Sequence, residues 1–196
     1  MIRVSTICLL GLLTTISEAS ESRPLFSFRE PDSAQQWVCV NDGVMGGRSD
    51  GRFIMDDLGF LRFYGRLSLA NNGGFASIRS RNRQISLREG DTLILKVRGD
   101  GRQYNLNLYP QRRRMAFSYR ASFATKQGEW TEVRIPLNDF AATSFGRVVR
   151  GAVLRPDQIS GLGISLSDKK PGFFRLDVKD VRVQNEEPRV VARPEK

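Results

Sequence analysis

Apolar and polar residues alternate in many short segments of this chain. The alternation is clear over residues 92–97, 104–108, 117–123, 131–135 and 174–178. Successive side chains of a β-strand point to opposite faces, so this alternation predicts strands that are buried on one side. No stretch of ten or more residues shows a helical period with capping residues at its ends. The pattern therefore predicts a chain made mostly of short strands.

Turn-forming residues separate these segments. Asp100-Gly101 lies between two predicted strands, and Asp-Gly is a strong hairpin signal because both central turn residues need positive φ. Asn72-Gly73-Gly74 marks another turn. The alternation changes parity at Lys179-Asp180, which predicts a β-bulge. The whole succession predicts an all-β fold, a single β-sandwich of the jelly-roll type at residues 24–184.

The two ends of the chain differ from this domain. Arg3 is followed by an apolar run over residues 4–16, which is long enough for a signal-peptide core and too short to span a bilayer. Small residues before a cut after Ala19 predict that residues 1–19 are a signal peptide and that the protein is exported, to a periplasm or outside the cell. An organelle presequence and an uncleaved anchor are the alternatives. No later segment predicts a membrane span, and the proline-containing residues 185–196 predict a flexible tail.

The composition excludes several kinds of catalyst. The chain has no histidine, so it has no Ser-His-Asp or Cys-His pair and no imidazole acid or base. Of its two cysteines, only Cys39 follows the signal peptide, inside an apolar run that predicts a buried thiol. We expect no enzyme, no cofactor and no metal site, with calcium at Asp42, Asp50 or Asp57 as an open alternative. An enzyme with paired carboxylates would have to draw them from Asp42, Asp50, Asp56, Asp57 and Asp100.

Positive charge is concentrated in the middle of the chain. The net charge is +10, from 31 Lys and Arg against 21 Asp and Glu. Residues 62–120 hold 13 of the basic residues, including the triplet 112–114, and only 3 of the acidic ones. Such a region favours encounters with anionic surfaces, acidic glycans or acidic proteins, although it can also be a solvated face without a dedicated partner. No nucleic-acid-binding motif accompanies it, so we expect no specific nucleic-acid partner.

Four ordered motifs carry a family resemblance. They are W-x-x-x-N-D-x-V-M-G-G-x-S at 37–49, F-x-G-x-L-S-L at 63–69, N-x-G-G-F-x-S-x-R at 71–79 and R-G-D-G-R-x-Y at 98–104. Together they resemble the CIA30 family, named for complex I intermediate-associated protein 30, over about residues 25–184. The resemblance implies a galactose-binding-like jelly roll and a non-catalytic factor that binds or assembles a protein complex, with protein partners. A role with respiratory complex I conflicts with export, because complex I assembly takes place elsewhere.

The first motif has two interpretations. In the structural one, Asn41-Asp42-Gly43 forms an Asx turn in which Gly43 takes an unusual φ, Val44 and Met45 pack inward, and the two glycines that follow allow another strand to approach closely. In the functional one, Asn41, Asp42 and Arg79 line a cleft that recognises a polar partner.

The remaining candidates also admit two interpretations. Asp100, Arg102 and Arg79 can form buried pairs that fix loops, or open arginines that grip a carboxylate or phosphate. Trp37 and Tyr104 are core aromatics or sugar-stacking platforms. An exported carbohydrate-binding module is therefore the alternative function. The candidate binding residues are Trp37, Asn41, Asp42, Arg79, Asp100, Arg102 and Tyr104.

Overall fold

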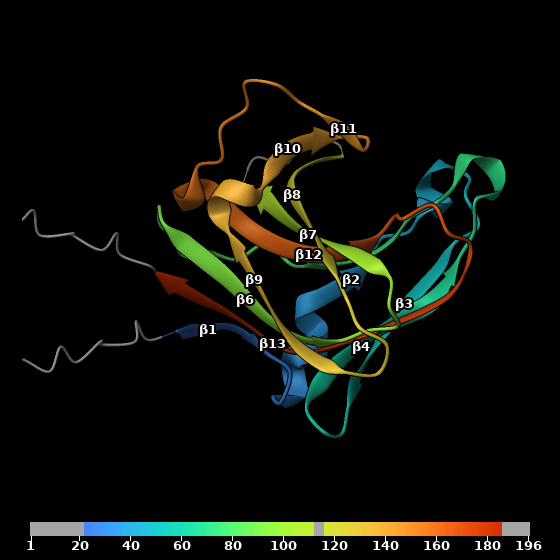
Figure 1. The fold of residues 1–196 in the computed structure, drawn as a ribbon, viewed down its shortest axis with the longest axis horizontal. Coiled ribbons are helices and arrows are strands. Elements are labelled where there is room, and N and C mark those ends of the chain that lie inside the picture. Colours follow the sequence, from blue (N-terminus) through green and yellow to red (C-terminus); the bar gives the residue numbers. More distant parts are fainter. Residues whose placement is uncertain (1–21, 112–115, 186–196) are drawn as a thin grey trace, which may run out of the picture.

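The computed structural model describes residues 22–111 and 116–185 and shows two antiparallel β-sheets packed face to face (Figure 1). The first sheet has the order β3 (Asp50–Asp56), β4 (Phe60–Leu67), β13 (Gly172–Asn185), β6 (Asp91–Arg98) and β9 (Trp130–Pro136), with β1 (Arg23–Ser27) also paired to β13. The second has the order β11 (Arg147–Val148), β10 (Ala141–Ser144), β8 (Phe117–Ala124), β7 (Gln103–Pro110), β12 (Ile159–Leu166), β5 (Ala76–Ser80) and β2 (Trp37–Cys39). The predicted all-β sandwich is confirmed.

The helical elements in the described part of the chain are short 3-10 turns between strands. They are η1 (Pro31–Gln36), η2 (Asp42–Met45), η3 (Ala70–Asn72), η4 (Leu137–Asp139) and η5 (Pro156–Gln158). The predicted signal peptide, the arginine triplet 112–114 and the predicted tail from residue 186 onward lie outside the described residues.

The core lies between the two sheets and follows the predicted alternation. Leu93, Leu95 and Val97 of β6 face Leu106 and Leu108 of β7 across it, and all five side chains are fully buried. Burying aliphatic side chains of this size stabilises the fold by roughly 1.5–3 kcal/mol each. The alternate positions of the same strands point outward, away from the core.

Two local predictions about the strands have different outcomes. The register between β13 and β6 shifts between Val178 and Asp180, which confirms the bulge. The hairpin at Asp100-Gly101 was wrong, because the strands on either side, β6 and β7, belong to opposite sheets. Of the two residues, only Gly101 has positive φ. The Asp100 carboxylate accepts hydrogen bonds from other segments, as described below.

Cys39 is exposed, so the prediction of a buried thiol was wrong. It ends β2, a three-residue strand at the edge of the second sheet. Trp37 at the start of β2 is in the core, whereas Cys39 stands where the chain leaves the sheet for a loop.

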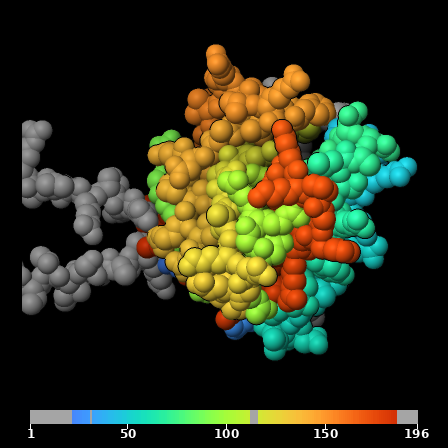
Figure 2. Space-filling model, turned by 45° about the vertical axis from the view of Figure 1, so that its right-hand side comes forward, coloured from blue at the N-terminus to red at the C-terminus, as the bar shows by residue number. Residues whose placement is uncertain are grey.

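Four loops meet at one end of the sandwich, at the right of Figure 1. They are residues 40–49, 68–75, 99–102 and 167–171, and strand pairing brings them together: Gly172 pairs with Leu67, and Leu166 pairs with Ala76. We call these four loops, with Phe173 directly after the last of them, the loop end. Figure 2 turns this side toward the viewer, with residues near 70 in green-blue and those near 170 in orange-red.

Candidate functional site

The Asp42 carboxylate is the centre of the first family motif, and it is fully buried. Its Oδ1 accepts a hydrogen bond from the Ser49 backbone N–H at 2.8 Å. Its Oδ2 accepts bonds from the Ser49 hydroxyl at 2.6 Å and from the backbone N–H groups of Gly74 at 2.7 Å and Phe75 at 3.2 Å. One carboxylate therefore joins loop 40–49 to loop 68–75. Burial alone raises the pKa of Asp42, but these bonds outweigh it and hold the pKa below its ordinary value.

Two glycines make room for this carboxylate. A Cβ at Gly47 would lie 2.4 Å from the Asp42 Cγ, and a Cβ at Gly73 would lie 2.6 Å from its Oδ2. A third glycine, Gly46, takes the left-handed conformation that ends η2, with a φ of 86°. The unusual φ thus falls at Gly46, and the prediction of it at Gly43 was wrong. The second glycine of the pair admits the Asp42 side chain, not another strand.

Val44 and Met45 point into solvent, and the prediction that they pack inward was wrong. They are 75 % and 53 % exposed on the 3-10 turn η2. The physical reason is that Asp42 occupies the inward position of the turn and turns the two following residues outward. An apolar pair in water costs free energy that a partner surface can recover.

Asp100 and Arg102 of the fourth motif hold another loop. The Asp100 carboxylate accepts bonds from the Tyr104 hydroxyl at 3.1 Å and from the Arg175 backbone N–H at 2.9 Å. Arg102 binds Asp168 with two nitrogens, at 3.0 Å and 2.7 Å, and also donates to the Phe173 carbonyl. Burial alone raises the pKa of Asp168, and the Arg102 bonds outweigh it and lower the pKa. These residues fasten loop 167–171 to the sheet.

Phe173 directly follows the loop that Arg102 and Asp168 hold in place, and its ring is exposed. It is 81 % exposed on the outer face of β13, and the Arg66 guanidinium lies over its ring at 5.5 Å from the centroid. A hollow of about 430 Å³ lies beside it, lined by Asp50, Arg52, Arg62, Tyr64, Gly65, Arg66, Phe173, Phe174 and Arg175. The hollow combines an aromatic ring with several guanidinium groups.

The seven candidate residues do not form one cleft. Trp37 is 3 % exposed against Phe26 and Phe28, and Tyr104 is fully buried, so neither offers a ring face to a ligand. Burial, together with the Asp100 charge, raises the pKa of Tyr104. Asn41 precedes Asp42 in the sequence, but its side chain donates to the carbonyl of Gly51 in β3 at 2.9 Å.

Arg79 is separate from all of these loops. It lies on β5 and points to the outer face of the second sheet, away from the core. The structure thus joins Asn41 with Asp42, and Asp100 with Arg102 and Tyr104, and leaves Arg79 apart.

Four of the five carboxylates that could have formed an acid-base pair already have partners, and two of them, Asp42 and Asp100, are described above. Asp50 pairs with Arg52 at 2.9 Å, and Asp56 pairs with Arg62 at 3.0 Å. In residues 22–111 and 116–185, no three of the His, Cys, Asp and Glu side chains come together as a metal site.

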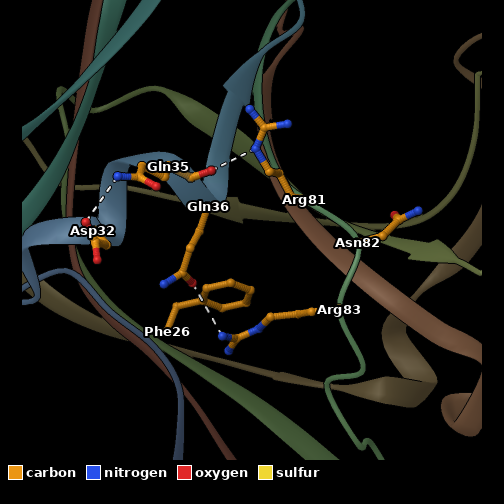
Figure 3. A pocket seen from close by; sticks show the side chains of 7 residues that line it. All are labelled: Phe26, Asp32, Gln35, Gln36, Arg81, Asn82 and Arg83. Carbon is orange, nitrogen blue, oxygen red and sulfur yellow. Dashed lines mark hydrogen bonds between the residues drawn. The ribbon is translucent and has the colours of Figure 1, made fainter.

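A second, polar pocket of about 270 Å³ lies between η1 and the segment that follows β5 (Figure 3). It is lined by Phe26, Asp32, Gln35, Gln36, Arg81, Asn82 and Arg83. The Arg83 guanidinium lies over the Phe26 ring at 4.3 Å and donates to Gln36, and Arg81 donates to the Gln35 carbonyl at 2.7 Å. These arginines fasten the segment after β5 to η1.

The exposed apolar residues of the loop end were not predicted from the sequence. Phe173 could have been, because Phe174 points into the core and the residue before it in a strand must point outward. Val44 and Met45 carry no such signal, because a turn has no period that assigns a face.

Within the described residues, no helix is long and apolar enough to cross a membrane. Among solved structures, the chain is similar in fold to the family 11 carbohydrate-binding module from Clostridium thermocellum. One such structure, in complex with a β-1,3-1,4-mixed-linked tetrasaccharide, has a TM-score of 0.61 at 12 % identity and covers 86 % of this chain and 98 % of that one. An agarase, AgWH50C, has a TM-score of 0.56 at 11 % identity over 85 % of this chain and 25 % of its own. At these identities the likeness concerns the fold alone.

Similarity in sequence is greater to another group of proteins. The mitochondrial complex I intermediate-associated protein 30 of Mus musculus is 31 % identical over 186 residues, which cover 83 % of this chain and 56 % of that protein. The Drosophila melanogaster protein of the same name is 27 % identical over 84 % of this chain and 63 % of its own length. The chain thus spans somewhat more than half the length of these relatives. Residues 26–178 match the family described as complex I intermediate-associated protein 30, and the chain belongs to this CIA30 family.

Proposed function

We propose that this chain is a non-catalytic factor that binds a protein and helps to assemble a multi-subunit complex. The observation that carries the proposal is the exposure of Val44 and Met45 on a turn that the buried Asp42 holds in place. A rigid apolar protrusion binds at low entropic cost, since its conformation is fixed before the partner arrives. The names of the relatives suggest subunits of complex I as the partner.

The loop end suits a protein surface better than a sugar. Its large exposed apolar side chains are Val44, Met45, Leu69 and Phe173, and methionine adapts its shape to an irregular apolar surface. The two aromatics that the sequence offered for sugar stacking, Trp37 and Tyr104, lie in the core. The guanidinium groups of Arg52, Arg62 and Arg175 near Phe173 bind carboxylates, so the exposed apolar side chains contribute more to this surface than net charge does.

Changing Val44 and Met45 to serine together is expected to weaken partner binding at least about tenfold, because truncating central apolar contacts usually costs more than 1 kcal/mol. The full chain, immobilised and crosslinked in its native cell fraction, is compared with the double variant, and captured proteins are identified by mass spectrometry. Subunits of a protein complex in the compartment of the mature chain are the expected capture, and complex I subunits are expected only where the chain is not exported.

The matched control for this experiment is Val153→Ser, because Val153 is as exposed as Val44 but lies outside the loop end. The control is expected to capture the same partner as the unchanged chain. Equal capture by the Val44 and Met45 variant, or equal loss with Val153→Ser, would remove the loop end as the binding surface. Thermal unfolding of each variant shows whether the fold is retained.

We also propose that the protein is exported and that residues 1–19 are removed. The apolar run that ends before small residues at the cut supports this. Protein isolated from its native cells is expected to begin at Ser20, as measured by intact mass and N-terminal sequencing. A mature chain that retains Met1, recovered from the cytosol, would contradict export and favour a partner inside the cell.

A further inference from the structure

One row of residues crosses the outer face of the second sheet. Arg79 on β5 pairs with Gly163 on β12, Gly163 pairs with Asn107 on β7, and Asn107 pairs with Arg120 on β8. The four residues therefore stand side by side on adjacent strands, with an arginine at each end. Adjacent strands are about 4.8 Å apart, so the two arginine Cα atoms are roughly 14 Å apart, within the combined reach of two such side chains.

Neither guanidinium is neutralised by a carboxylate of the described residues. Arg79 donates through Nε to the Ser77 hydroxyl at 3.4 Å, and Arg120 donates through Nε to Asn107 Oδ1 at 3.0 Å. In the part of the chain that the structure describes, neither forms an ion pair, and the terminal nitrogens of both make no hydrogen bond. The contrast is with Arg62, Arg98 and Arg102, which all bind carboxylates.

Tyr109 and Gly163 fix where the head of Arg79 lies. A Cβ at Gly163 would lie 2.9 Å from the Tyr109 Cε2 and 3.1 Å from its hydroxyl, so the Tyr109 ring lies over the glycine. The Arg79 guanidinium sits over that ring at 5.2 Å from its centroid. The aromatic ring thus holds the head of Arg79 above the middle of the row.

A layer of small polar side chains supports this arrangement. Asn107 accepts from the Ser118 hydroxyl at 3.2 Å and donates to the Ser165 hydroxyl at 3.0 Å, so its amide is fixed where it holds Arg120. In the next row, Ser122 donates to Asn105 at 2.8 Å. Most of these groups are buried. Their mutual bonds leave the terminal nitrogens of the two arginines without an acceptor among the described residues.

The electrostatics of this row favour an anion. Burial lowers the pKa of Arg120, and the positive charge of Arg79 lowers it further, so the two like charges are close enough to repel each other. The outward residues of β5, β7, β8 and β12 include no acidic side chain that could relieve the repulsion. An oxyanion between the two guanidinium groups would relieve this repulsion and accept hydrogen bonds from their N–H groups.

We propose that Arg79 and Arg120, with Tyr109 between them, form a binding site for a small-molecule oxyanion, a carboxylate or a phosphate. Guanidinium groups present paired donors that match the oxygens of both anions. The site is distinct from the loop end, and it does not depend on the assembly role proposed above.

The test is calorimetric titration of the full chain at low salt with inorganic phosphate and, separately, with citrate. We expect at least one of them to bind, and the pair shows whether phosphate or carboxylate is preferred. Arg79→Gln and Arg120→Gln are each expected to weaken binding about tenfold or more, whereas Arg79→Lys retains part of the affinity. Added salt is expected to weaken binding in every case.

Arg88→Gln is the matched control, because it removes the same charge from an exposed position between β5 and β6, away from this row. It is expected to leave the affinity unchanged. Unchanged affinity in Arg79→Gln, or equal loss in Arg88→Gln, would overturn the proposal. The absence of binding to both anions would also overturn the proposal. If poly-glutamate then binds, the partner of this face is an acidic protein surface and not a small molecule. Thermal unfolding identifies a variant that does not fold. If Arg120→Gln fails to fold, the affinity of Arg79→Gln decides between the outcomes, because Arg79 is less involved in the hydrogen bonds of the sheet.

Discussion

Replacing Asp42 with alanine is expected to lower the free energy of unfolding by about 3–5 kcal/mol. The change leaves the backbone N–H groups of Ser49, Gly74 and Phe75 without their acceptor, inside a space that is closed to water. A buried donor without a partner costs about 1–3 kcal/mol, and bonds to a charged acceptor are stronger than bonds to a neutral one. Equilibrium unfolding in urea measures the change through the transition midpoint.

Asp57→Ala is the control for this prediction. Asp57 is an exposed carboxylate in the β3–β4 turn, and its loss is expected to change stability by no more than about 0.5 kcal/mol. If Asp42→Ala destabilises the protein no more than Asp57→Ala does, then the buried carboxylate does not hold the loops. Asp42→Ala is also expected to bind the proposed protein partner less well than the unchanged chain, because the turn that carries Val44 and Met45 loses its anchor.

The low pKa of Asp42 gives this stabilisation a direction in pH. The carboxylate has a lower pKa in the folded state than the value of about 3.9 in an unfolded chain. Its contribution is therefore complete above that unfolded value and is lost as the pH falls through the folded pKa. Asp42→Asn lacks this titration, so its stability is expected to fall less steeply below about pH 4 than that of the unchanged chain.

The alternation of side chains was sufficient to predict the strands and the sandwich. It also located the bulge near Lys179, because a change of parity has only one local explanation in a strand. The same reasoning could not place Val44, Met45 or Asp100-Gly101. Whether a turn residue faces water, and whether a turn joins neighbours in one sheet or crosses to the other, depends on contacts between segments distant in the chain.

The motifs indicated the important residues but not their roles. Asp42, Asp100 and Arg102 act as internal fasteners, while the surfaces that they present are Val44, Met45 and Phe173. A motif in sequence mixes residues that hold a loop with residues that the loop displays. The two can be separated only when burial is known.

The positive residues at 62–120 also have two different roles, because some are bound to carboxylates and others are not. Arg62, Arg98 and Arg102 are bound to carboxylates that lie outside that range, at Asp56, Asp168 and Asp177. Arg79 and Arg120 form no ion pair within the described residues. The net charge of a segment therefore overstates the charge that is free to meet a partner, because charge is cancelled between strands that are distant in sequence.

Asp177→Ala is expected to lower the free energy of unfolding by about 3–5 kcal/mol, the range measured when one partner of a buried charge cluster is removed. The Asp177 carboxylate is only 1 % exposed and binds Arg62 at 2.9 Å, Arg98 at 2.8 Å and Arg175 at 3.0 Å. Burial alone raises the pKa of Asp177, and the three guanidinium groups outweigh it and lower the pKa. Without the carboxylate, three positive charges repel one another on adjacent strands.

The three arginines differ in how easily they escape that repulsion. Arg175 is about half exposed and can turn into water, but Arg98 lies against the Trp130 ring at 4.8 Å and Arg62 lies over Phe60. These two must give up their aromatic contacts before they reach solvent, which is why the expected loss exceeds that of a surface pair. Asp180→Ala tests this reasoning on the same strand, since Asp180 pairs with Arg182 at a partly exposed site and its loss is expected to cost no more than about 1 kcal/mol. Equal transition midpoints in urea for the two variants would mean that the Asp177 cluster does not stabilise the first sheet.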